Sequence, residues 1–379
     1  MPHIEQTSRR GRSVAGRRAA RLAAALLALA IAALALAACG KDGESEGKSV
    51  GGIDPSAVVA RYDGGEVTGR QLIAYLGAHK FLNLNEMYGF YEMLPSFKQD
   101  MLYRLIATRL ITAEADEETD KASRASAAEM IAALEKTLDQ DEEYKKGVEQ
   151  FLESEGITLK DIEDYLVQSL NLQAVLEKKF SDDDLRARYD QILKEDENAF
   201  LRATVRHVLV GLTDGEGNER TEEEALKRIK EAQVKLKNGA DWKAVAREYS
   251  EDPGSKENGG RYEDVEVSLW VEEFKRHAIE QPVGELGEPF KTSYGYHIML
   301  VEDRRQPGFE EVREDIREMV ASEYFFNMVE QEVPKLVTEV NLPEPELPEG
   351  FENVEAGGTD GGGETDGSGD TENTGGDGP

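Results

Sequence analysis

The feature that most limits the possible folds is a change in the spacing of apolar residues near Ala203. Before it, apolar side chains recur every three or four residues, as in Phe97, Met101 and Leu105, which is the spacing of an amphipathic helix. After it, residues 205–210 are rich in β-branched side chains and predict a strand. Because the two patterns occupy separate blocks, the chain is expected to be an α+β protein with a helical module and a smaller mixed domain.

Three short motifs indicate where helices of the module begin. In a capping box, a hydroxyl side chain and an acid or amide three residues later each bond the other residue's backbone N–H. The candidate pairs are Thr68 with Gln71, Thr158 with Asp161, and Ser181 with Asp184. A strand over residues 57–62 and an Asp-Gly-Gly turn precede the first pair. We therefore expect a strand, a turn and a helix, followed by a region that is almost entirely helical.

The mixed domain shows its own order of elements. Helical patterns cover residues 225–236 and 242–249, and Trp270, Phe274 and Ala278 share one face of a third expected helix. Two closing strands are expected, one around Phe290 and one over residues 296–301. The chain then becomes helical again after a Pro-Gly pair at residues 307–308.

The two ends of the chain have compositions that do not suit a folded core. Residues 1–38 combine an Arg-rich start with a run of only Ala, Leu and Ile, which is typical of an export signal. Residues 39–52 are polar and predict a flexible tether, while residues 342–379 are acidic and Gly-rich and predict a disordered tail. The foldable body is therefore expected over residues 53–341.

The only cysteine, Cys39, ends the apolar run in the sequence Leu-Ala-Ala-Cys. This segment resembles the lipobox of bacterial lipoproteins, which implies that Cys39 is diacylated and becomes the mature N-terminus. The alternative is a transmembrane anchor, since 17 uncharged residues are just long enough to span a thin bilayer.

Charge and cysteine content exclude several functions. The chain has 45 Lys and Arg against 77 Asp and Glu, and recognition of nucleic acid needs basic side chains to neutralise phosphates. One cysteine excludes an intramolecular disulfide and a multi-cysteine zinc site, and neither a metal nor a cofactor is predicted. His79 and His277 are expected to be ordinary surface positions on helices.

Several collinear segments resemble a parvulin-type peptidyl-prolyl isomerase domain over residues 201–304. The matching segments are 205–210 (VRHVLV), 236–242 (LKNGADW), 249–255 (YSEDPGS), 258–260 (NGG), 282–285 (PVGE) and 294–298 (YGYHI). The resemblance implies a small antiparallel sheet with helices, and catalysis of rotation about X-Pro bonds.

The resemblance also implies a site made of two histidines, a hydroxyl and an apolar slot for the proline ring. By position, the catalytic histidines are His207 and His297, and the hydroxyl is that of Thr292. Phe274 is expected as the aromatic wall of the substrate slot. Trp270 stands where the family has Met, and its indole is bulkier than a thioether.

Arg261 occupies the position that is expected to be Cys or Asp in active members, and it is counted among the substrate-binding residues. A guanidinium has only donors and cannot replace an accepting carboxylate. Glu263 or Asp264 remains an alternative source of the acid.

The surroundings of this domain resemble the PrsA/SurA group of extracytoplasmic foldases, in which an isomerase domain is inserted into a helical chaperone module. That module is expected over residues 53–200, with residues 305–341 forming a C-terminal helix that packs on it. The resemblance implies a foldase tethered to the cell membrane, whose partners are X-Pro peptides and unfolded or newly exported proteins. The alternative is a non-catalytic holdase with a degenerate isomerase domain, which Arg261 and Trp270 favour.

Overall fold

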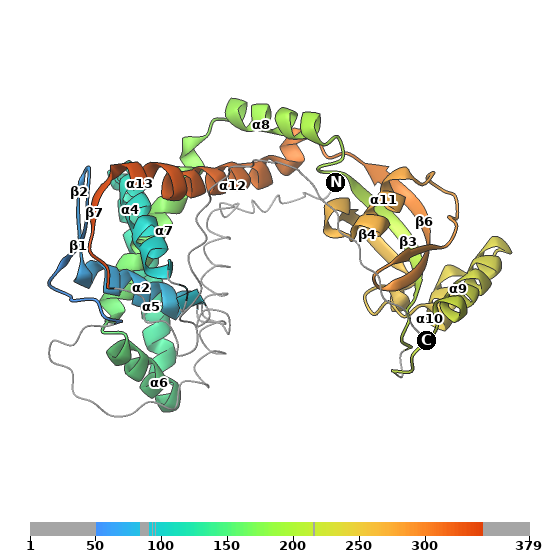
Figure 1. Ribbon diagram of the computed structural model, residues 1–379, viewed down its shortest axis with the longest axis horizontal. Coiled ribbons are helices and arrows are strands. Elements are labelled where there is room, and N and C mark those ends of the chain that lie inside the picture. Colours follow the sequence, from blue (N-terminus) through green and yellow to red (C-terminus); the bar gives the residue numbers. More distant parts are fainter. Residues whose placement is uncertain (1–50, 84–90, 93, 95, 215–216, 344–379) are drawn as a thin grey trace, which may run out of the picture.

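The computed structural model describes residues 51–83, 91–92, 94, 96–214 and 217–343, which form two lobes joined by a pair of helices (Figure 1). The expected signal over residues 1–38, Cys39, most of the tether and nearly all of the acidic tail lie outside the described residues. Within the described part, no helix is both long enough and apolar enough to cross a membrane.

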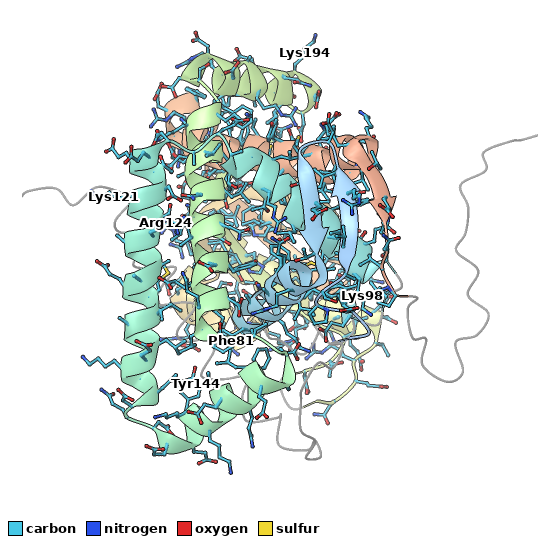
Figure 2. All side chains as sticks on the ribbon, turned by 90° about the vertical axis from the view of Figure 1, so that its left-hand side faces the viewer. Phe81, Lys98, Lys121, Arg124, Tyr144 and Lys194 are labelled. Carbon is cyan, nitrogen blue, oxygen red and sulfur yellow. The ribbon has the colours of Figure 1, made fainter. Side chains whose placement is uncertain are left out.

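The first lobe is mostly helical and combines the N-terminal half of the body with the C-terminal end of the body. Its elements are β1 (Val58–Tyr62), β2 (Gly65–Thr68), α2 (Gly69–Asn83), α4 (Phe97–Thr112), α5 (Glu117–Leu138), α6 (Glu142–Ser154), α7 (Leu159–Lys179), the π-helical turn η4 (Met328–Glu332), α13 (Val333–Leu336) and β7 (Val337–Val340). Figure 2 looks onto this lobe and shows α5 and α7 side by side, with α6 below them.

The capping motifs begin helices where the sequence predicts. At α7, the Thr158 side chain accepts from the Asp161 N–H, and the Asp161 carboxylate accepts from the Thr158 N–H at 2.7 Å. The same reciprocal pair of bonds begins helix α8 (Asp182–Glu195) at Ser181. At α2, the Thr68 N–H donates to the Gln71 side chain at 3.0 Å. These predictions are confirmed because the signal lies entirely within one helical turn.

A three-stranded sheet in the order β2-β1-β7 covers one side of this lobe. Strands β2 and β7 were not predicted, and the expected helix over residues 305–341 ends at Leu336 instead of continuing to Asn341. Both strands are only four residues long, too short to show an alternating pattern, and β7 pairs with the distant β1, where Ala60 lies opposite Val340.

The core of the helical lobe draws on both ends of the body. Leu102, Leu105 and Ile106 of α4 are buried at its centre. Val329 and Val333, from the C-terminal part of the body, belong to the same apolar cluster. The C-terminal segment therefore completes a core that the N-terminal helices begin.

Two helices run between the lobes at the top of Figure 1: α8 and α12 (Phe309–Asn327). Leu185 of α8 packs against Phe309 and Ile316 of α12, and Leu185 and Ile316 are fully buried. The Tyr189 hydroxyl donates to the Pro307 carbonyl at 2.9 Å. The two connections between the lobes thus share one small core.

The second lobe is an antiparallel sheet with helices on both faces. Its elements are β3 (Arg202–Val210), α9 (Glu222–Lys237), α10 (Trp242–Tyr249), the 3-10 turn η2 (Lys256–Asn258), β4 (Arg261–Glu266), the 3-10 turn η3 (Val267–Leu269), α11 (Glu272–Glu280), β5 (Phe290–Thr292) and β6 (Gly295–Arg305). The strand order is β4-β3-β6-β5. Helices α9 and α10 pack on one face and α11 on the other, so the protein has the expected α+β fold.

One strand of this lobe was missed, and one expectation for the lobe is wrong. Strand β4 was not predicted, because its sequence RYEDVE is mostly charged and lacks an apolar alternation. Trp270 was expected on the same helix as Phe274, but it has an extended backbone (φ −95°, ψ 153°) and α11 begins only at Glu272. Two acids in the first turn of α11 favour a start at that point through the helix dipole.

Candidate active site

The two central strands of the second lobe bring the two predicted histidines together. His207 of β3 lies opposite Met299, and His297 of β6 lies opposite Leu209, so strand alternation puts both side chains on the α11 face. They are 2% and 3% exposed, respectively. Their Nδ1 atoms are 3.3 Å apart, and their rings are stacked with centroids at 5.6 Å.

Thr292 extends this pair at the edge of the sheet. It lies on β5, which pairs with β6, and its Oγ1 is 2.8 Å from Nε2 of His297. The backbone N–H of Tyr294 donates to the same oxygen at 3.0 Å. The three residues named from the resemblance are therefore in contact.

Asp252 lies at the other end of the histidine pair, and it was not identified as a site residue from the sequence. Its Oδ2 is 3.1 Å from Nε2 of His207, which also lies 3.0 Å from Oγ of Ser255. Ser255 in turn bonds the carboxylate of Asp252. Both residues belong to the YSEDPGS segment, so the available signal was an acid within a segment already matched to the family.

Two glycines allow the loop that carries Asp252 to approach β3. Gly259 and Gly260 both have left-handed backbones (φ 82° and 74°), which favour glycine. A Cβ on Gly260 would lie 2.0 Å from the His207 carbonyl oxygen, and the His207 N–H donates to the Gly260 carbonyl at 2.8 Å. The residue before Asp252, Glu251, is also fixed, because its Oε1 accepts a hydrogen bond from Nη2 of Arg220 at 2.9 Å.

The side chains from Asp252 to Thr292 form a row of hydrogen bonds, and the charge state of Asp252 determines which atoms donate. Burial works to raise the pKa of Asp252, but hydrogen bonds from His207 and Ser255 outweigh it and hold that pKa well below its ordinary value. An ionised carboxylate only accepts, so His207 Nε2 carries a proton. When the His207 ring is neutral, its Nδ1 accepts from Nδ1–H of His297. Nε2 of His297 then accepts from the Thr292 hydroxyl.

His297 is held in its neutral form. Burial, assisted by the neighbouring His207, lowers the pKa of His297 to about 3. A ring that stays uncharged at neutral pH and makes two hydrogen bonds is suited to fixing geometry. A hydrogen-bonded row thus runs through Thr292, His297, His207 and Asp252, and we call it the polar floor.

Aromatic side chains border this floor. Phe274 of α11 lies edge-on to His207 at 5.1 Å and to His297 at 5.4 Å between ring centroids. Trp270 contacts Phe274 at 5.1 Å, and Tyr262 stacks on His207 at 5.4 Å. We call Tyr262, Trp270 and Phe274 the aromatic wall. Their apolar faces beside a fixed polar row can hold a proline ring while the backbone of a peptide crosses the floor.

Arg261 does not lie in this site. It is directly opposite Arg206 on β3, and successive residues of a strand face opposite sides, so both arginines lie on the face away from His207. The Arg261 guanidinium bonds Glu302 at 2.8 Å and Glu263 at 2.6 Å. The expectation that Arg261 replaces an acid beside the histidines is therefore wrong.

The alternative acids are also engaged elsewhere. Glu263 pairs with Arg261, and Asp264 bonds Arg305 at 2.7 Å. The carboxylate that accompanies the histidines is that of Asp252, so the site has the accepting group that a guanidinium at residue 261 cannot supply.

The two remaining helical histidines are not ordinary surface residues. His277 is half-buried and stacks on Phe290 with ring centroids 3.8 Å apart. His79 is half-buried beside Tyr75 and Tyr165, and burial lowers its pKa to about 4. Across the residues that the structure describes, no group of three or more His, Cys, Asp or Glu side chains is arranged to hold a metal ion.

A second candidate site is a groove in the helical lobe, where α5, α7 and α12 meet. Its volume is about 1360 Å³. The apolar side chains lining it include Met130, Leu170, Leu172, Leu176, Phe325 and Phe326. Charged side chains, among them Arg104, Glu177 and Arg317, line it as well, and Phe326 is 61% exposed. A groove with this mixed lining fits an extended or helical peptide segment.

Comparison with known proteins agrees with this geometry. Residues 191–305 match the sequence profile of the family described as PPIC-type PPIASE domain. The foldase protein PrsA 4 of Bacillus cereus is 35% identical over 172 residues, which are 44% of this chain and 52% of that protein. The foldase protein PrsA of Caldanaerobacter subterraneus is 28% identical, with 67% and 72% of the two chains covered. The chaperone SurA of Pseudomonas savastanoi is 40% identical over 101 residues, 27% and 23% of the two chains.

Among solved structures, a PrsA peptidylprolyl isomerase from Bacillus cereus is 21% identical, with 77% of this chain and 96% of that chain covered and a TM-score of 0.35. The second lobe therefore matches the family described as PPIC-type PPIASE domain. Proteins named PrsA and SurA are similar to parts of the chain, and the chain spans about half the length of the PrsA 4 relative that it matches.

Proposed function

We propose that this protein is an extracytoplasmic foldase that isomerises X-Pro bonds in exported proteins and holds unfolded segments in its helical lobe. In this proposal residues 201–304 are the catalytic domain, and residues 53–200 with 305–341 are the chaperone module. The observation that carries the proposal is the buried row of hydrogen-bonded side chains from Thr292 to Asp252 beside the aromatic wall.

The reaction requires only that a partial double bond be twisted. The barrier to rotation is about 18–20 kcal/mol because the planar amide is stabilised by resonance, which puts negative charge on its oxygen. A twisted amide is less polar, so an apolar slot that excludes water favours it over either planar form. A fixed carboxylate near the carbonyl oxygen adds to this preference, because it repels the planar form more strongly.

Each side chain then has a defined role. Phe274 and Trp270 hold the proline ring, and the ionised Asp252 supplies the fixed negative charge. His207, His297 and Thr292 keep that carboxylate and the floor in place, and no proton has to move.

A cis/trans isomerisation assay of the purified chain on short X-Pro peptides tests the proposal. The wild type should exceed the spontaneous rate, and Asp252→Asn should lower kcat/KM at least tenfold. Glu263→Gln is the matched control, since this acid bonds Arg261 on the opposite face of the sheet and should leave the rate unchanged. A wild-type rate equal to the spontaneous one would refute catalysis.

The second candidate function is a holdase without catalysis, and the groove of the helical lobe favours it. Phe326→Asn would place an amide in the groove at a position too exposed to affect the core. We expect weaker suppression of aggregation of an unfolded client. Leu269→Asn, at a still more exposed residue of the isomerase lobe, is the control. Equal suppression by both variants would count against the groove as a client site.

We propose further that a lipid on Cys39 anchors the protein to the outer face of the cell membrane. The lipobox-like sequence around Cys39 supports this proposal. A radiolabelled fatty acid fed to the cells should be incorporated into the wild type and not into Cys39→Ser. A transmembrane anchor would instead leave the wild type unlabelled as well.

A further inference from the structure

Tyr262 lies at the junction between the aromatic wall and the polar floor. It pairs with Val205 across β4 and β3, which puts its side chain on the same face as His207. Its ring stacks on the His207 ring with an interplanar angle of 26°, and it lies 6.4 Å from Trp270. Its hydroxyl is 3.0 Å from Oδ2 of Asp252.

Three donors converge on one oxygen of Asp252. His207 Nε2, Ser255 Oγ and the Tyr262 hydroxyl all bond Oδ2, and no described residue bonds Oδ1. Ser255 lies in the same loop as Asp252, so only His207 and Tyr262 tie the carboxylate to the sheet. Together they fix its position and orientation from β3 and β4.

Gly254 provides independent evidence that the Tyr262 hydroxyl is accommodated at this point. Its backbone does not need glycine, since its φ is not positive. A Cβ at this residue would, however, lie 2.6 Å from the Tyr262 hydroxyl oxygen. The missing side chain therefore leaves the space that the hydroxyl occupies.

We propose that Tyr262 is a positioning residue of the isomerase site, acting through Asp252 and His207. Its hydroxyl holds Oδ2 as the acceptor of the His207 Nε2 proton and leaves Oδ1 unbonded, while its ring serves as a wall of the slot. The inference rests on the proposed function for its effect on rate. Burial and the adjacent Asp252 raise the pKa of Tyr262 to about 12, so the hydroxyl remains a donor at neutral pH.

The test compares Tyr262→Phe, Gly254→Ala and the double variant in the full chain. Tyr262→Phe keeps the ring and removes the donor, so we expect kcat to fall about tenfold with KM unchanged. Gly254→Ala should cause a similar fall by displacing the hydroxyl. In the double variant the added methyl group has no hydroxyl to displace, so the two losses should not add. Tyr296→Phe, at a tyrosine whose hydroxyl contacts Glu222 outside the site, is the matched control.

A second readout does not depend on turnover. The ¹⁵N NMR signals of the histidines report which ring nitrogen carries the proton, and Tyr262→Phe should shift the His207 population away from the Nε2–H form. Unchanged kcat together with an unchanged tautomer, or additive losses in the double variant, would overturn the inference. If the wild type proved inactive, the proposed function would fall, and the NMR signals would still decide whether Tyr262 positions His207.

Discussion

The buried His297 predicts a loss of stability of the isomerase lobe in mild acid. Its native pKa of about 3 lies below the ordinary value of 6.5, because burial and His207 disfavour the charged ring. The unfolded chain therefore binds a proton that the native lobe does not, and stability falls as pH drops from 6.5 towards 3. Between pH 7 and pH 5 this proton uptake by the unfolded chain lowers the free energy of unfolding by about 2 kcal/mol.

The chain offers a local probe for this measurement. Both of its tryptophans, Trp242 and Trp270, belong to the isomerase lobe, so urea unfolding followed by tryptophan fluorescence reports on that lobe. His277 adds to the acid loss in the same direction, because burial also lowers its pKa. The contribution of His297 is therefore isolated by comparing wild type with His297→Gln at each pH.

His297→Gln should be less stable than wild type at pH 7 but should lose about 2 kcal/mol less between pH 7 and pH 5. Thr292→Val is the control, because it removes the 2.8 Å hydrogen bond to His297 and keeps the titrating ring. That variant should be destabilised while retaining most of the pH dependence. If His297→Gln lost as much stability in acid as wild type, the reasoning about the buried neutral ring would be refuted.

Three further substitutions test the packing described above by urea unfolding. Gly260→Ala should destabilise the isomerase lobe by more than about 2 kcal/mol, because its Cβ would meet the His207 carbonyl; a neutral effect would contradict the close approach. Leu185→Ala, in the core shared by α8 and α12, should lower the free energy of unfolding by about 2–5 kcal/mol. Small-angle scattering should then show a wider range of distances between the lobes, and an unchanged scattering profile would argue against a rigid connection. Thr158→Ala should cost about 1 kcal/mol through loss of the α7 cap, and Thr158→Ser should restore it.

The parts of the fold that could be predicted are those with local signals. The starts of α7 and α8 followed from the capping boxes at Thr158 and Ser181, whose partners lie one turn away. Strands β2, β4 and β7 could not be predicted, because they are short or charged and are stabilised by pairing with other strands. Such strands are determined by tertiary contacts and not by their own residues.

The site shows the same division. The contact of His207, His297 and Thr292 agrees with what the family resemblance implied. The orientation of Arg261 depended on a strand that was not predicted, and without strand alternation its face could not be assigned. Asp252 lies in a loop, where sequence spacing says little about direction.

The strand pairing at the base of the isomerase lobe has a consequence for how such proteins can evolve. Arg202, where β3 begins, lies directly opposite Arg305, where β6 ends, so the chain enters and leaves the lobe at adjacent strand positions. A gene encoding the helical lobe alone could therefore acquire the other lobe by a single insertion, with little loop-closure entropy to offset. Loss of the inserted segment would likewise leave the end of α8 close enough to the start of α12 for a short turn to join them.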